Sequence, residues 1–222
     1  SKIFVLMTDI DLNGILISGS YYPSFKASFD GNCYTISNFT IGGGDGTSSQ
    51  IGFFGNVKPS SETKIYIKNL TFTNFAFKVE TTENEKSIGL ISQISSDDNK
   101  ETTTLENITV ILQKPSLITT KTTSDSDNYC ALGFLVGIGT YVTLLDCNVI
   151  VSSRIDILVT EEKSLYVGGL CGWTQNASYM ACSVNLIGAT FLMHTQSEPH
   201  IGVLCGRSWT NSDDADADPG SY

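Results

Sequence analysis

Six cysteines carry much of the reactive chemistry in this chain, at positions 33, 130, 147, 171, 182 and 205. No two of them form a Cys-x-x-Cys pair, and the two histidines lie far from any cysteine pair, so the spacing does not predict a zinc site. Cys147 and Cys182 occupy equivalent positions after a repeated glycine phrase, and so do Cys171 and Cys205. We expect buried free thiols that fill the core, and a disulfide within either pair is the alternative.

Carboxylates suggest one candidate cation site and no catalytic pair. Aspartates alternate with alanines near the C-terminus, and Asp214, Asp216 and Asp218 are candidate Ca²⁺ ligands because calcium prefers carboxylate oxygens. A solvated acidic linker explains the same residues, so we expect no obligatory cofactor. Enzymes that cleave polysaccharides need paired carboxylates or Ca²⁺ beside a base, whereas among the strand positions that we predict to face outward only Asp146 is acidic. We therefore assign no catalytic residue.

Four Asn-x-Ser/Thr sequons are candidate glycosylation sites on a secreted chain, at Asn38, Asn69, Asn107 and Asn176. The alternative explanation is structural, because a recurring Asn-x-Thr phrase would also form an outward polar ladder. Asn38, Asn69 and Asn107 are expected one strand spacing apart, where bulky glycans would crowd one another.

Length and charge exclude several classes of function. The chain has 222 residues, a net charge of −10 and a pI near 4.5, which argues against binding nucleic acid or anionic lipid. No apolar run is long enough for a membrane span. The chain begins at Ser1 without a Met or a signal peptide, so we interpret it as a mature form or an excised segment.

A glycine phrase recurs five times and defines the architecture that must position these residues. Its copies start near residues 51, 88, 132, 167 and 201, every 34 to 44 residues, and the fourth is Val167-Gly168-Gly169-Leu170-Cys171-Gly172. An alternating phrase follows each of the first four copies, as in Ile67-Lys68-Asn69-Leu70-Thr71-Phe72, and an extra copy lies upstream at Ile36–Ile41. Alternation of this kind is typical of strands with one buried face.

Aligning the copies predicts two inward and two outward ladders. The inward ladders are Phe39, Leu70, Ile108, Cys147, Cys182 and Ile41, Phe72, Val110, Val149, Val184. The outward ladders are Asn38, Asn69, Asn107, Asp146, Ala181 and Thr40, Thr71, Thr109, Asn148, Ser183.

Repeats that each bury half of a strand cannot form a core alone, so they must stack. We predict an all-β parallel β-helix of about five to six coils with three strands each, the third strand being a segment such as Asn74–Val79. Residues 1–50 would form an N-terminal capping segment and first coil, residues 51–208 the repeats, and residues 209–222 an acidic tail or linker. A β-propeller fits less well because Asn-Gly hairpin signals are scarce.

The order of these phrases resembles the GLUG-type repeat family, named for its Gly-Leu-x-Gly core. The resemblance is carried by Val167–Gly172 followed by Ala181–Val184, and by the opening Thr8-Asp9-Ile10-Asp11-Leu12 with the later Tyr34–Asn38. It implies a right-handed β-helix in secreted or cell-surface proteins that are often adhesin-like. It supplies no catalytic residues.

These features favour a noncatalytic extracellular or cell-surface β-helix that acts as a stalk, an adhesin or a filament subunit. Its expected partners are further chain of a larger protein, other copies joined end to end, glycans or surface proteins. The C-terminal coil lacks an apolar cover in the sequence, which predicts that the chain does not act as a free monomer. The alternatives are a polysaccharide lyase or hydrolase and an ice- or surface-binding protein that uses Thr40, Thr71 and Thr109.

Overall fold

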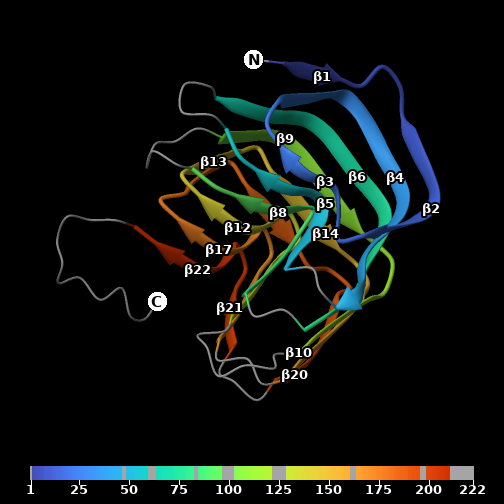
Figure 1. The fold of residues 1–222 in the computed structure, drawn as a ribbon, viewed down its shortest axis with the longest axis vertical. Helices are drawn as coiled ribbons and strands as arrows, with labels where there is room; N and C mark the ends of the chain where they lie inside the picture. The colour runs from blue at the N-terminus through green and yellow to red at the C-terminus, as the bar shows by residue number, and fades with distance from the viewer. Residues whose placement is uncertain are drawn as a thin grey trace.

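The computed structural model describes residues 2–46, 49–59, 64–82, 85–96, 103–121, 129–160, 164–195 and 199–210, with side chains for all of these except 43–46 and 85. Every element in these ranges is a strand, and every recorded strand pair is parallel (Figure 1). In the same ranges no helix is long and apolar enough to cross a membrane.

The strands follow one another in levels along the solenoid, where a level is one complete or partial passage of the chain around the solenoid axis. The first three levels contain β1 (Ile3–Val5), β2 (Ile10–Ser18), β3 (Ser20–Phe25), then β4 (Ser28–Gly46), β5 (Gln50–Val57), then β6 (Ile65–Thr81), β7 (Glu85–Ile88), β8 (Ile91–Ile94). The fourth contains β9 (Thr103–Leu112), β10 (Ser116–Lys121), β11 (Tyr129–Gly133), β12 (Val136–Thr140). The fifth contains β13 (Val142–Leu145), β14 (Asn148–Val151), β15 (Arg154–Thr160), β16 (Ser164–Gly168), β17 (Cys171–Gln175). The last contains β18 (Ser178–Met180), β19 (Ser183–Asn185), β20 (Thr190–Thr195), β21 (Pro199–Gly202), β22 (Cys205–Trp209).

Parallel ladders confirm the predicted β-helix class. One ladder runs from β2 through β4, β6 and β9 to β14 and β19, and another runs from β6 through β10 and β15 to β20. About four of these six levels form complete turns, slightly fewer than the predicted five to six coils. The predicted third strand is real, because the Phe75–Val79 part of β6 lies between β4 and β10 in a ladder that continues through β15 to β20.

The glycine phrases align as the sequence predicts, but each later copy forms two strands rather than one. Ile51 lies beside Ile88, Ile88 beside Leu132, and Gly133 beside Gly168. A two-residue turn inside the phrase separates β7 from β8, β11 from β12, and β16 from β17. The turn brings backbones together, since a Cβ added to Gly172 would lie 2.6 Å from the Leu132 nitrogen.

Apolar side chains fill the interior in the predicted ladders from the third to the fifth level, and the last members of these ladders, Cys182 and Val184, are half-buried. Leu70, Ile108 and Cys147 are all buried, as are Phe72, Val110 and Val149. Aromatic rings dominate the N-terminal half of the core, where the rings of Phe39 and Phe75 stack with their centroids 5.0 Å apart. Stacking at this distance adds to the stabilisation from burial.

The predicted alignment of the upstream copy, Ile36–Ile41, is wrong, because most of this copy lies beside the strand segment that follows the next corner of the coil. Phe39 lies beside Phe75 rather than Leu70, and Thr40 lies beside Ala76 rather than Thr71. The residues that precede Leu70 and Phe72 in their ladders are Tyr34 and Ile36. The threonine ladder therefore contains Thr35, Thr71, Thr109, Asn148, Ser183. Thr40 is not part of the proposed ice-binding array.

The asparagine ladder also differs from the prediction, because its members form corners rather than outward strand positions. Asn69, Asn107, Asp146 and Ala181 all have φ between 50° and 53°. Asparagine and aspartate adopt this left-handed conformation more readily than other non-glycine residues. Asn107 Nδ2 donates to Asn69 Oδ1 at 3.0 Å, and Asn69 Nδ2 donates to Asp30 Oδ1 at 3.1 Å. The polar side chains therefore stack along one edge of the solenoid.

Candidate functional site

A second apolar cluster lies outside the main core, in the angle between the two strands of each glycine phrase. Ala131, Ile138 and Tyr166 are buried in it, and Tyr129 and Trp173 are half-buried against them. The cluster joins two ladders from opposite sides of the phrase. One contains Ala131, Tyr166, His200, and the other contains Ile138, Trp173, Arg207.

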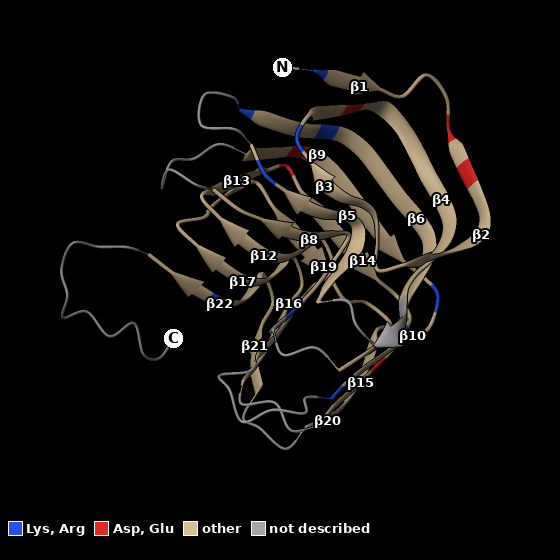
Figure 2. Ribbon diagram, in the orientation of Figure 1, with Lys and Arg blue, Asp and Glu red and all other residues tan. Residues whose placement is uncertain are grey.

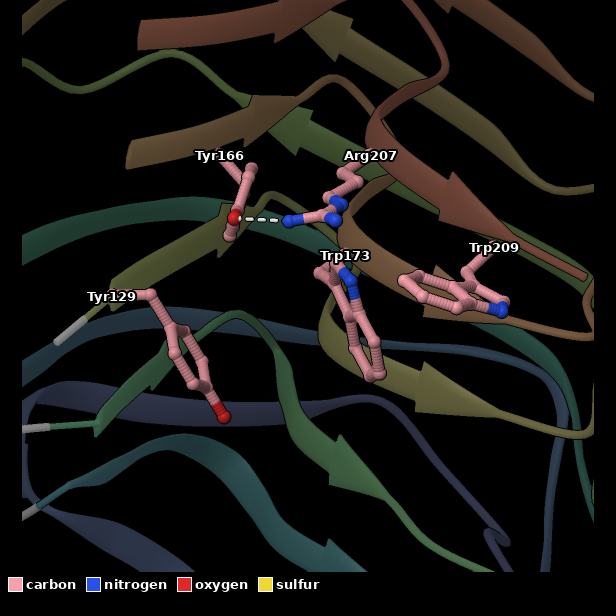
Figure 3. A pocket seen from close by; sticks show the side chains of 5 residues that line it. All are labelled: Tyr129, Tyr166, Trp173, Arg207 and Trp209. Carbon is pink, nitrogen blue, oxygen red and sulfur yellow. Dashed lines mark hydrogen bonds between the residues drawn. The ribbon is translucent and has the colours of Figure 1, made fainter. Parts of the chain in front are cut away.

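A pocket of about 270 Å³ opens over this cluster (Figure 3). It is lined by Tyr129, Tyr166, Trp173, Arg207 and Trp209. These residues come from β11, β16, β17 and β22, so three successive levels of the solenoid build it. Its walls are aromatic, and both tryptophans of the chain take part.

Arg207 is held in place by the aromatic side chains around it. One guanidinium nitrogen donates to the Tyr166 hydroxyl at 2.6 Å, shown as the dashed line in Figure 3. The guanidinium carbon lies 5.3 Å from the Tyr166 ring centroid and 5.8 Å from that of Trp209, within the range of cation–π attraction. A guanidinium has five N–H donors, so this single hydrogen bond leaves several for a ligand.

The strands that line the pocket carry one positive charge and no carboxylate, and the neighbouring strand β7 carries Glu85, which is paired in register with Tyr129. β11, β12, β16, β17, β21 and β22 contain no Asp or Glu, and Arg207 is their only Lys or Arg. Figure 2 shows the contrast with the N-terminal strand β2, where acidic positions stand out in red. Arg207 is therefore the one positive charge that these six strands bring to the pocket, although the whole chain has a net charge of −10.

The cysteines lie where the repeat alignment predicts, and all six are free thiols. Cys171 pairs in register with Cys205, and Cys147 and Cys182 each precede the paired residues Asn148 and Ser183. Cys130, Cys147 and Cys171 are buried, as expected for core-filling thiols, whereas Cys182 and Cys205 are half-buried and Cys33 is exposed. Within the described ranges no group of three or more His, Cys, Asp or Glu is arranged to hold a metal ion.

The remaining sequence candidates do not converge on one site. The Ca²⁺ candidates Asp214, Asp216 and Asp218 lie outside the described residues. His194 and His200 lie on different ladders, beside Leu158 and Tyr166 respectively.

The sequon asparagines are not arranged as the repeat alignment suggested. Asn69 and Asn107 are neighbours, but Asn38 occupies another corner, where its Nδ2 donates to Asp11 Oδ1 at 3.0 Å. Asn176 lies at a further corner with φ of 50°. The Nδ2 atoms of Asn38, Asn69 and Asn107, which would carry glycans, all donate hydrogen bonds within the chain. Glycosylation of these three residues would replace those contacts.

Sequence reasoning missed the aromatic pocket, although a signal was present. Trp173 and Arg207 directly follow the closing glycines of the last two phrases, Gly172 and Gly206. Equivalent repeat positions occupied by large aromatic and cationic residues, in place of the Ile138 of the preceding copy, could have marked a binding surface. No family model, curated protein or solved structure matches this chain.

Proposed function

We propose that this chain is a noncatalytic extracellular or cell-surface β-solenoid of the adhesin-like kind, and that its aromatic pocket binds an acidic glycan. The observation that carries the proposal is the combination of two tryptophans, two tyrosines and an arginine without a carboxylate partner among the described residues, in one open pocket. The solenoid serves as a stiff support that presents the pocket.

The aromatic walls favour a sugar ring over other ligands. A pyranose has an apolar face of C–H groups that packs on an indole or phenol ring, while its hydroxyls need polar atoms at the edge of the contact. Trp209 is 47% exposed and offers such a face, and the hydroxyl of Tyr166 is within the pocket wall. Amphipathic rings of this kind recur where a ligand is half apolar and half wet.

Arg207 selects for an acidic sugar. A guanidinium pairs with a carboxylate through two parallel N–H···O bonds, which fix the orientation of the ligand. Nucleic acid is a poor candidate because phosphate backbones are bound by several cations, and the six strands around the pocket supply one. A uronate-containing oligosaccharide has both the apolar ring face and a single carboxylate per ring.

The pocket favours binding over hydrolysis. Glycosidases place two carboxylic acids on either side of the scissile bond, and the six strands that surround this pocket contain none. The resemblance of the repeats to GLUG-type adhesin-like proteins supports the same interpretation.

Intrinsic fluorescence tests the proposal directly, because both tryptophans of the chain line the pocket. Titration with an oligouronate should quench or shift the emission, and the carboxyl-reduced form of the same oligosaccharide should bind at least about tenfold more weakly. Arg207→Gln should remove this preference for the acidic form. Trp209→Ala should weaken binding of both forms.

Tyr66→Ala is the matched control, because Tyr66 is a similarly exposed aromatic residue on β6, away from the pocket. It should bind like the wild type. Equal affinity for the acidic and reduced sugars, or no binding of either, would contradict the proposal. Release of new reducing ends during incubation would instead favour the polysaccharide-cleaving alternative.

End-to-end assembly is a second candidate function, and the exposed ends of the core ladders favour it. Ile88, Leu132 and Val167 are buried, whereas Ile201, the next member of their ladder, is 63% exposed. At the other end Ile15, which lies beside the buried Phe39, is 48% exposed. A second copy stacked on either end would continue these ladders, as open-ended contacts do in filaments.

Analytical ultracentrifugation tests this assembly. The wild type should form concentration-dependent oligomers, and Ile201→Lys should shift them toward monomer. Leu117→Lys is the control, because Leu117 is 51% exposed on β10, which has neighbours on both sides. A wild type that stays monomeric at all concentrations would exclude self-assembly through these ends.

A further inference from the structure

Two pairs of thiols connect the same two levels of the solenoid. Cys147 and Cys171 belong to the fifth level, and Cys182 and Cys205 are their neighbours in the sixth. The sixth level also supplies Arg207 and Trp209 to the pocket. A covalent bond within either pair would therefore fasten the outermost level to the body of the solenoid.

The Cys147–Cys182 pair is arranged for such a bond. Each of these cysteines directly follows a left-handed corner residue, Asp146 with φ of 50° and Ala181 with φ of 53°. The two cysteines are neighbours across the levels, because the residues that follow them, Asn148 and Ser183, are paired in register and Ser183 N donates to the Cys147 carbonyl oxygen at 3.0 Å. Because both cysteines lie at corners between strands rather than inside them, a small rotation can bring the sulfurs together without breaking a strand pair.

The other pair is less well arranged, because Cys171 and Cys205 lie inside the paired strands β17 and β22 rather than at corners between strands. Cys205 Sγ lies 2.9 Å from the Arg207 carbonyl oxygen and 3.3 Å from Thr174 Oγ1. Cys171 is fully buried. Cys147 and Cys182 therefore form the better candidate.

The two thiols of this pair differ in access, which assigns their roles. Cys182 is half-exposed, whereas Cys147 is fully buried. The neighbouring Cys147 thiol lowers the pKa of Cys182, whereas the Cys182 thiol and burial raise the pKa of Cys147, so Cys182 is the thiol that ionises first. An accessible thiolate beside a second thiol is the arrangement that undergoes thiol–disulfide exchange.

We propose that Cys147 and Cys182 are a reversible modification site that forms a disulfide between the last two levels by exchange with a small disulfide such as oxidised glutathione. The Cys182 thiolate attacks one glutathione sulfur, forms a mixed disulfide and expels a glutathione thiolate. Cys147 then gives its proton to solvent and attacks the Cys182 sulfur, which releases the second glutathione. The protein loses two electrons and two protons, and one glutathione disulfide becomes two thiols.

Mass spectrometry of the full chain tests the proposal. A Cys33→Asn background removes the exposed thiol that would otherwise take up glutathione, and asparagine suits the φ of 64° at that position. After treatment with oxidised glutathione and alkylation under denaturing conditions, the chain should have two fewer free thiols. Peptide mapping should find Cys147 linked to Cys182, and dithiothreitol should restore both thiols.

Single variants separate the two steps. Cys147→Ala should stop at a stable glutathione adduct on Cys182, whereas Cys182→Ala should neither take up glutathione nor lose thiols. Cys130→Ala is the control for loss of a buried thiol, and it should form the link as the parent does. Thiols that all stay free, or a link between Cys171 and Cys205 instead, would overturn the proposal.

Proteolysis measures what the bond does to the fold. If the disulfide fastens the last level, cleavage within residues 183–210 should slow at least about fivefold on oxidation, because local opening of that level becomes rarer. The Cys147→Ala variant should show no such change. The thiol count and the proteolysis rate do not depend on glycan binding, so this proposal and the proposed function can fail separately.

Discussion

Single residues at the corners decide where the chain turns. Asn69, Asn107 and Asp146 adopt a left-handed conformation that suits their side chains, whereas Ala181 adopts it without that advantage. The recurrence of asparagine is visible in the sequence, and asparagine favours turns in proteins generally. Reading these residues as outward strand positions failed because a strand and a shallow corner keep the same alternation on both sides.

Replacing Ala181 should show what the left-handed conformation costs at a residue without a polar side chain. Ala181→Asn should raise the free energy of unfolding by about 1 kcal/mol, because asparagine tolerates a φ of 53° better than alanine does. Denaturant titration measures the change. Ala181→Val should have the opposite effect, and equal stability of all three proteins would show that this corner is not strained.

The reactivity of Cys182 should depend on pH in a way that identifies its neighbour. The neighbouring Cys147 thiol lowers the pKa of Cys182 to about 6, so alkylation by iodoacetamide should rise between about pH 5 and pH 7 and then level off. In Cys147→Ala the rise should move to higher pH. An unchanged profile in that variant would exclude Cys147 as the cause.

At the scale of strands, the repeat pattern predicted the fold well because one ladder position requires the same residue type in every level. The glycine phrases aligned correctly, since the turn inside them leaves no room for a side chain. The upstream phrase misled because the third level has two asparagine corners, Asn69 and Asn74. The phrase around Asn38 matches either corner locally, and only pairing across levels selects Asn74.

Strand faces can be tested in the centre of the solenoid. Ile108→Asp should cost at least about 3 kcal/mol, because Ile108 is fully buried and a carboxylate there has no partner of opposite charge in its ladder. Thr109→Asp, one residue away and half-exposed, should cost less than about 1 kcal/mol. Equal damage measured by thermal unfolding would contradict the assigned faces.

The turn in the glycine phrase can be tested in the same manner. Gly172→Ala should destabilise the chain by at least about 2 kcal/mol, because its Cβ would lie within 2.8 Å of three backbone atoms that cannot move aside. Gly139→Ala is the matched control, since its nearest neighbours are side-chain methyl groups at 3.0 Å and beyond. A larger loss of stability in Gly139→Ala than in Gly172→Ala would show that close packing of the backbones is not the reason for glycine at position 172.

The aromatic pocket was missed in the sequence for a reason that also lies at the scale of strands. Tyr129 and Trp209 are far apart in sequence and lie on opposite sides of the glycine turn. They meet only because the turn folds two ladders toward each other, and the alignment treated the glycine phrase as one straight strand. The angle between the ladders, rather than the alignment, brings them together.

For the whole molecule, a solenoid is stabilised level by level, because each level contacts only its neighbours. The inward-facing residues of the third and fourth levels are buried, whereas most residues of β20 and β21 in the last level are exposed. Stability should therefore fall toward the ends of the structure described here.

Hydrogen exchange followed by mass spectrometry should show this gradient. Amides in β6 and β9 should exchange at least about tenfold more slowly than those in β19 and β21, because opening an outer level breaks one interface and opening an inner level breaks two. Uniform protection along the chain would indicate that the solenoid opens as a single cooperative unit.

The equal rise of the levels also makes the solenoid a molecular ruler. Each level adds about 4.8 Å along the axis, so the height of the pocket above the N-terminal strands is fixed by how many levels lie between them. Deleting the segment that joins Leu132 to Val167, which occupy the same ladder position, would remove one level and leave the register of the rest intact. The reach of such a protein can therefore change by whole steps, through gain or loss of a single repeat, without a new fold.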